Sequence, residues 1–360
     1  MANWRNCRRR VSPSRINYDA ILLVSFGGPE CNADVMPFLE NVLRGRNVPR
    51  ERMLQVAEHY YLFGGKSPIN DQNRALIAAL SAELKRHGPE LPIYWGNRNW
   101  HPMLADTLRQ MKADGVKRAI AFATSAYSSY SSCRQYRENI AAAQGAAGDG
   151  APQVDKLRVF YNHPLFVEAN VDHVREALNR IPEDRRASAR IAYTAHSIPV
   201  GMSQTCDYQR QLLEVGRLVS EALGREPDPL VFQSRSGPAL QPWLEPDILD
   251  HLREIKRQGA TDVVIAPIGF VSDHMEVLYD LDTEARLLCS ELGLNMERAA
   301  TAGTHAKFVS MIHELIVERM EESPAKRVVG IYPANPDVCL IDCCPEPVRP
   351  AMAAVATTTA

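Results

Sequence analysis

Three carboxylates at four-residue intervals follow a short apolar run in the C-terminal half of the chain. The run covers residues 263–266, and Glu276, Asp280 and Glu284 lie beyond the turn that it enters. On a helix this spacing puts all three side chains on one face. Like charges four residues apart destabilise an isolated helix by roughly 0.2–0.5 kcal/mol per pair. A cation held along the face would compensate for this repulsion, and a solvated acidic face is the alternative interpretation.

A histidine follows a second predicted strand in the same half. This strand covers residues 189–194 and leads to His196, while His274 and Glu276 follow the strand described above. Ligand sites of α/β proteins lie beyond the carboxyl ends of strands. A histidine and a carboxylate that meet there can ligate a divalent metal and transfer protons. A structural or solvated histidine is the alternative.

Apolar strands alternate with amphipathic helices along the whole chain, which predicts parallel sheets covered on both faces. The predicted strands cover residues 18–25, 92–96, 118–124, 156–161, 189–194, 230–234, 262–267 and 294–300. We therefore expect an α/β fold with two Rossmann-like domains. Each has a four-stranded parallel sheet flanked by helices, and the active-site cleft lies between them. The predicted parts are a disordered leader (1–17), an N-terminal domain (18–185), a C-terminal domain (186–325) and a Cys-containing tail (326–360).

The composition makes several partners unexpected. The formal net charge is -2, so neither nucleic acid nor an anionic membrane is indicated as a binding partner. The chain has no apolar run of about 18 residues, the length expected of a transmembrane helix. Its basic first ten residues are not followed by the apolar segment of a secretory signal. We expect a cytoplasmic protein.

Three cysteines fall within six residues near the C-terminus. Cys339, Cys343 and Cys344 do not have the C-x2-C spacing of a zinc ribbon. Three thiols need a fourth ligand to hold an iron–sulfur cluster. Cys206 is the candidate, because it lies in the loop after His196. A reduced tail without a metal is the alternative.

Aromatic side chains recur where predicted strands end. Phe26, Tyr60, Tyr127 and Trp243 lie in or beside such loops rather than inside periodic helices. This placement suits a broad, flat, apolar ligand held by stacking, although aromatic residues more commonly pack in a core.

Eight segments together resemble the ferrochelatase family, in the family's order and over about 260 residues. The segments are LLVSFGGPE (22–30), GGKSPIN (64–70), YWGNRNWHP (94–102), ATSAYSSYSS (123–132), TAHSIP (194–199), FQSRSGP (232–238), PWLEPD (242–247) and PIGFVSDHMEVLYDLD (267–282). The resemblance implies a lyase of haem biosynthesis that inserts Fe2+, its metal substrate, into protoporphyrin IX or coproporphyrin III. Two other functions compete with it: a tetrapyrrole or haem carrier without turnover, and a cobalt chelatase of an earlier tetrapyrrole.

The resemblance also implies roles for single residues. His196 and Glu276 match the catalytic and metal-handling pair, and Asp273 and His274 belong to the same motif as supporting residues. Asp280 and Glu284 resemble an acidic ladder for metal or protons. The porphyrin-binding candidates are Phe26, Tyr60, Ser67, Arg98, Tyr127 and Trp243. Phe26 stands where some members carry a ligating Tyr or a Met, and a phenyl ring cannot ligate a metal.

Family members with a C-terminal cysteine cluster bind a [2Fe-2S] cluster, which implies Cys206, Cys339, Cys343 and Cys344 as its ligands here. The partners implied are the porphyrin and, as transient contacts, haem-pathway enzymes or a membrane surface.

Overall fold

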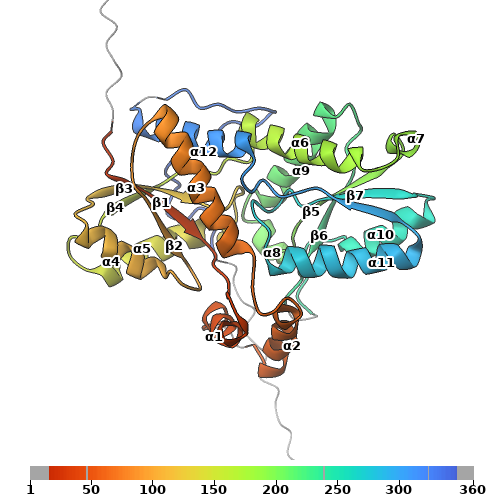
Figure 1. Ribbon diagram of the computed structural model, residues 1–360, viewed down its shortest axis with the longest axis horizontal. Coiled ribbons are helices and arrows are strands. Elements are labelled where there is room, and N and C mark those ends of the chain that lie inside the picture. The colour runs from red at the N-terminus through yellow and green to blue at the C-terminus, as the bar shows by residue number, and fades with distance from the viewer. Residues whose placement is uncertain (1–15, 46–47, 238–239, 323, 347–360) are drawn as a thin grey trace, which may run out of the picture.

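The computed structural model describes residues 16–45, 48–237, 240–322 and 324–346. Two four-stranded sheets, all parallel, stand side by side with helices around them (Figure 1). The predicted α/β class with two parallel sheets is confirmed. Most of the predicted leader, residues 1–15, lies outside the described residues, as does the end of the tail from residue 347.

The N-terminal sheet has the strand order β2-β1-β3-β4. Its strand β1 is buried at every position and apolar except for Ser25, as expected of a strand covered on both faces. The strands are β1 (Ala20–Ser25), β2 (Ile93–Asn97), β3 (Arg118–Ala123) and β4 (Gln153–Lys156). The helices in this part of the sequence are α1 (Asn32–Val42), α2 (Arg50–Tyr61), α3 (Ile69–His87), α4 (Leu104–Ala113), the π-helix η1 (Tyr130–Arg134), α5 (Gln135–Ala147) and α6 (Pro164–Asn179). Of these, α6 packs against β7 and β8 of the second sheet.

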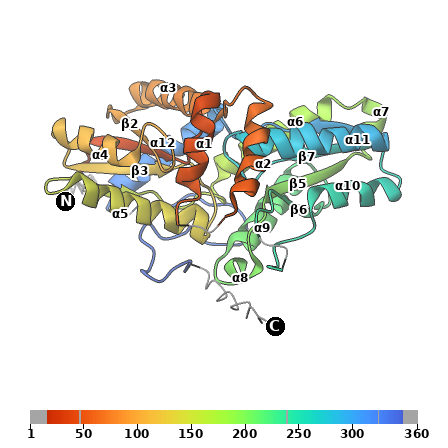
Figure 2. The ribbon, with the colours of Figure 1, turned by 90° about the horizontal axis from the view of Figure 1, so that it is seen from below.

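The C-terminal sheet has the order β6-β5-β7-β8. Its strands are β5 (Arg190–His196), β6 (Leu230–Gln233), β7 (Asp262–Ala266) and β8 (Asn295–Arg298). The helices are α7 (Glu183–Arg186), α8 (Val200–Ser203), α9 (Tyr208–Ala222), α10 (Ile248–Arg257), the π-helix η2 (Val277–Ala285), α11 (Arg286–Leu292) and α12 (Ala306–Met320). Helices α1 and α2 lie in front of the junction between the two halves when the molecule is seen from below (Figure 2).

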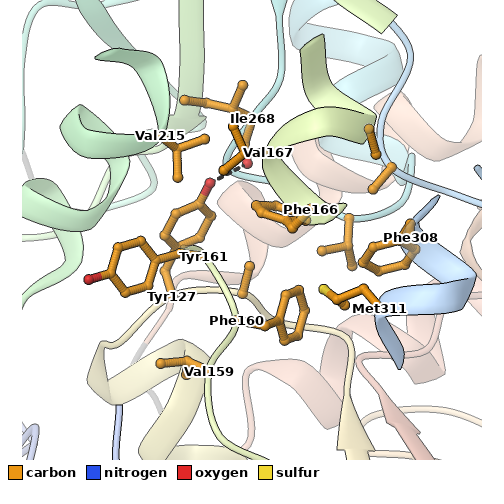
Figure 3. Close-up of a cluster of buried hydrophobic side chains, with 14 of the residues drawn as sticks. Tyr127, Val159, Phe160, Tyr161, Phe166, Val167, Val215, Ile268, Phe308 and Met311 are labelled. Atoms are coloured by element: carbon orange, nitrogen blue, oxygen red, sulfur yellow. Dashed lines mark hydrogen bonds between the residues drawn. The ribbon is translucent and has the colours of Figure 1, made fainter. Parts of the chain in front are cut away.

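One apolar core joins the two halves. Helix α12 follows the second sheet in sequence but packs against α3 and α6. Phe160, Phe166 and Phe308 contact one another there, with ring centroids 5.4 to 6.1 Å apart (Figure 3). Buried aromatic clusters of this kind dominate core energetics. The predicted domain boundary at residues 185 and 186 therefore does not separate two independent cores.

Two predicted elements differ from the structure. The fourth strand ends at Lys156, whereas the sequence predicts a strand over residues 156–161. Residues 157–161 are buried without forming a strand, and all of them except Arg158 belong to the shared apolar core. The helix predicted beyond Glu276 is a π-helix over residues 277–285. Such helices are rare and occur often at functional sites.

In the described part of the chain, no helix combines the length and the apolar character needed to cross a bilayer.

Candidate active site

The two loops that carry the predicted pair are brought together by close backbone packing. His196 is the last residue of β5, and β7 runs parallel beside it. The loop after β7 crosses β5 at Gly269, whose amide donates to the Thr194 carbonyl at 3.0 Å. A Cβ added at Gly269 would lie 2.5 Å from the Ala195 Cβ. Glycine is therefore required here for the loop to approach the residue before His196.

Glu276 lies between two imidazole rings. Its Oε2 is 3.6 Å from His196 Nε2 and 3.7 Å from His274 Nδ1. The side chains of His196 and Glu276 are 30% and 48% exposed, so a bound molecule has access to both. The sequence prediction that His196, His274 and Glu276 converge at one sheet edge is thus met in the geometry.

The His196–Glu276 pair is charged near neutral pH. Partial burial opposes a charge on His196, but the Glu276 carboxylate outweighs it and raises the pKa of His196 to about 9. Burial likewise raises the pKa of Glu276, but the imidazolium outweighs it and lowers that pKa to about 2. The charge of His196 therefore stabilises the folded protein. This contribution is complete below about pH 6.5 and is lost as pH rises through about 9. The contribution of the Glu276 charge to the stability of the folded protein is complete above about pH 4.5 and is lost as pH falls through about 2.

The tautomer of His196 is set by its own loop. The Nδ1 atom lies within hydrogen-bonding distance of the Ser197 carbonyl, which can only accept. The proton of a neutral ring therefore sits on Nδ1, and Nε2 is left for Glu276 or for a ligand.

Asp273 holds the loop in place. Both of its carboxylate oxygens accept from Arg298 at 3.1 Å, and its backbone amide donates to Gln72 of α3 at 2.8 Å. Arg298 also donates to Asp282 of η2 at 2.7 Å. One guanidinium thus ties the start of the loop to the π-helix that follows Glu276, and the Gln72 contact joins it to the N-terminal half.

The acidic residues of η2 remain close to one another although the helix is of the π type. Burial is the main cause that raises the pKa of Asp280 to about 7, with Glu276 and Glu284 on either side adding repulsion. Burial and Asp247 raise the pKa of Glu284. The Ser234 hydroxyl donates to the Asp280 carboxylate.

Two of the predicted porphyrin-binding residues, Tyr60 and Trp243, lie near the segments that carry the pair, and Phe26 and Arg98 contact each other in the N-terminal half. Phe26 is 37% exposed, and the Arg98 guanidinium lies 5.7 Å from its ring centroid. Tyr60 packs against Phe38, and the Glu276 charge contributes, after burial, to its raised pKa. Trp243 pairs with Pro199, three residues beyond His196.

The two other porphyrin-binding candidates, Tyr127 and Ser67, are buried. Tyr127 is 2% exposed and its hydroxyl donates to the Ile268 carbonyl at 2.7 Å (Figure 3). Ser67 is 3% exposed, and a Cβ at Gly28 would lie 2.7 Å from its Cβ. Both side chains contact loop backbone: Tyr127 contacts the loop after β7, and Ser67 lies against Gly28.

The cysteines of the tail meet a residue that the sequence analysis did not include. Cys343 Sγ and Cys344 Sγ are 3.6 Å apart. The thiol of Cys339 is hydrogen-bonded to Cys133 of η1, which lowers the pKa of Cys133 to about 5 and raises that of Cys339. These four cysteines line one cavity of about 240 Å³. Cys206 does not line it and donates instead to the Met202 carbonyl at 3.2 Å.

The tail reaches this cavity through arginines of the N-terminal half. Arg137 of α5 donates to the carbonyls of Leu340 and Ile341 at 3.0 and 3.1 Å. Cys133 lies three residues after Tyr130, in a segment that the sequence analysis considered only for its Ser and Tyr residues. Its proximity to Arg134 and Arg137 was the available signal, since cations favour a thiolate.

No three or more His, Cys, Asp or Glu side chains of the described residues are arranged to hold a single metal ion. The four cysteines form two close thiol pairs instead.

The family model described as ferrochelatase matches residues 18–320. The chain belongs to the ferrochelatase family. It is 58% identical to a ferrochelatase of Rhodopirellula baltica over 91% of this chain and 93% of that protein. It is 50% identical to a coproporphyrin III ferrochelatase of Streptomyces coelicolor, over 93% of this chain and 96% of that protein. The activity of this ferrochelatase is the insertion of Fe2+ into a porphyrin in haem biosynthesis.

A solved structure with the same fold is SirB from Bacillus subtilis with Fe3+. It is 12% identical, with a TM-score of 0.52, and the match covers 84% of this chain and 96% of SirB. At this identity the similarity concerns the fold alone.

The charge pair predicts how His196 titrates. In the Glu276→Gln variant the pKa of His196 should fall from about 9 towards about 6.5, because its main favourable partner loses its charge. NMR of labelled histidine in the full chain between pH 5 and 10 measures this change. The exposed Glu291 of α11 gives the matched control Glu291→Gln, which should leave the titration unchanged. A wild-type His196 that titrates near pH 6.5 would contradict the charged pair.

Proposed function

We propose that this ferrochelatase inserts Fe2+ into coproporphyrin III through His196 and Glu276. The observation that carries the proposal is the 3.6 Å separation of His196 Nε2 and Glu276 Oε2 at the end of two adjacent strands. Both side chains are partly exposed. A nitrogen and an oxygen donor at one accessible point suit a divalent iron ion and the protons that it replaces.

The choice of porphyrin is supported by the relatives. Those of Streptomyces coelicolor and Nocardia farcinica, 50% and 49% identical over 93% of this chain, are both named coproporphyrin III ferrochelatase. Identity of this extent over nearly the full length supports the same substrate here.

Charge balance determines what the acidic residues have to do. Each Fe2+ that enters the macrocycle replaces two pyrrole N–H protons, so two protons leave the site per turnover. When the resting pair is charged, the Glu276 carboxylate is the base that is free to accept a proton. His196 becomes a base when the approaching cation favours loss of its proton, because like charges lower the pKa of an imidazole. Asp280 and Glu284 would carry protons onward along η2.

Removal of either member of the pair should abolish most of the activity. We expect His196→Ala and Glu276→Gln to lower kcat by about 10²–10⁴-fold, the range of general acid–base catalysis. The measurement is anaerobic insertion of Fe2+ followed by the visible bands of the porphyrin. Glu291→Gln should match the wild type. A variant of the pair that keeps a near-normal rate, or a wild type that shifts the porphyrin bands without consuming iron, would contradict the proposal.

The same assay compares two porphyrins. Coproporphyrin III carries two more carboxylates than protoporphyrin IX. One additional hydrogen bond to a charged group is worth about 1.5–3 kcal/mol, which corresponds to a preference in kcat/KM of at least about tenfold. We expect coproporphyrin III to be the better substrate at matched concentrations of monomeric porphyrin. An equal or higher kcat/KM for protoporphyrin IX would contradict the substrate assignment.

We also propose that the tail holds a [2Fe-2S] cluster. Such a cluster takes four thiolates, and the two thiol pairs Cys133–Cys339 and Cys343–Cys344 share one cavity. The hydrogen bond from Cys339 lowers the pKa of Cys133 and so favours its thiolate, the form that ligates iron. This donor set replaces Cys206 of the sequence prediction with Cys133. When bound, the cluster would supply one-electron redox capacity and a cross-link between η1 and the tail.

Two serine variants separate the alternative fourth ligands. Cys133→Ser should abolish the visible absorbance of the cluster and the sulfide content of protein purified without oxygen, because one iron loses a thiolate. Cys206→Ser should leave both unchanged. The reverse pattern would favour Cys206, and a colourless wild type free of sulfide would contradict the cluster.

A further inference from the structure

Two consecutive residues at the end of β6 attach the π-helix η2 to the strand that carries His196. Gln233 pairs with His196 in the register of β5 and β6. Its side-chain amide donates to the Glu276 carbonyl at 3.3 Å. The next residue, Ser234, donates from its hydroxyl to the Asp280 carboxylate. The end of β6 therefore contacts both Glu276 and the first acidic residue after it.

Ser234 has a strained backbone. Its φ is +63°, and among the described residues other than glycine only Cys344 shares a positive φ. A side chain in the left-handed region costs free energy and persists where the surrounding structure enforces it. Such residues cluster at active sites. Neither the sequence motif nor the charge pair explains why a serine takes this conformation.

The partner of Ser234 needs to be held. Asp280 lies between the carboxylates of Glu276 and Glu284, which repel it, and it is partly buried. In the wider turn of a π-helix, helix geometry alone does not orient this side chain. The hydroxyl of Ser234, the residue after β6, supplies this constraint. A hydrogen bond to a charged acceptor is stronger than one between neutral groups.

We propose that Ser234 is a positioning residue for iron insertion: its hydroxyl holds the Asp280 carboxylate beside the His196–Glu276 pair. The left-handed backbone turns the side chain out of the sheet direction of β6 and towards η2. The Asp280 carboxylate is then held in a single orientation, in which it can contact the incoming iron or accept a proton that leaves the pair. This inference rests on the proposed roles of His196 and Glu276.

Three substitutions of Ser234 separate the hydroxyl from the backbone. Ser234→Gly removes the hydroxyl and accepts the left-handed conformation without strain. Ser234→Asn also tolerates that conformation and supplies an amide donor. Ser234→Ala removes the hydroxyl and keeps the strain. The exposed Ser236 of the same loop provides the matched control Ser236→Gly.

The full-length protein is assayed anaerobically with coproporphyrin III while Fe2+ is varied. We expect Ser234→Gly to lower kcat by about tenfold, as for loss of one hydrogen bond to a charged group, and to raise the KM for Fe2+. The KM for the porphyrin should stay unchanged. Ser234→Asn should restore most of the lost rate, and Ser236→Gly should match the wild type. The thermal midpoint of Ser234→Gly should be no lower than that of the wild type, because the glycine relieves strain.

Wild-type kcat and iron KM in Ser234→Gly would overturn the inference. Equal loss in Ser234→Gly and Ser234→Asn would also overturn it, since a structural role alone gives no rescue. These results are distinct from failure of the pair, which would appear as a near-normal rate in His196→Ala in the same assay.

Discussion

The structure depends on one electrostatic contact, between an imidazole at the end of β5 and a carboxylate in the loop after β7. Each group favours the charge of the other: Glu276 raises the pKa of His196 and His196 lowers that of Glu276, although partial burial opposes both charges. Coulomb energy falls with distance and with the surrounding dielectric. A displacement of either loop by a few ångströms would therefore change both pKa values and the ability of the pair to receive a divalent cation.

Much of the surrounding structure keeps this distance constant. Gly269 lets the β7 loop lie against Ala195, and Arg298 connects Asp273 to Asp282 across the loop and the π-helix. Gln72 of α3 accepts from the Asp273 amide, so the N-terminal half also contributes. These contacts act on the position of the backbone and of the loop, so residues with no part in the chemistry still determine the geometry of the pair.

The shared apolar core holds the two halves of the molecule at a fixed separation. Helix α12 returns from the second sheet to pack on α3 and α6, and Phe308 contacts Phe166 between the two halves. A ligand contacted by both halves would need them held at a fixed separation, because a displacement of about 1 Å at a site is costly. The aromatic cluster and the contact from Tyr127 to Ile268 provide this rigidity.

Local patterns in the sequence determined the alternating strands and helices, the strand ends that carry His196 and Glu276, and the family to which the chain belongs. The elements follow from side-chain periodicity and turn residues, which depend on near neighbours in the chain, and the family follows from the resemblance of eight short segments. Only the tertiary structure decided that Tyr127 and Ser67 are buried, that Cys133 shares a cavity with the tail cysteines, and that Ser234 contacts Asp280. Each of these depends on contacts between segments 39 to 206 residues apart in the sequence. No local pattern encodes such a meeting, because it follows from the shape of the whole core.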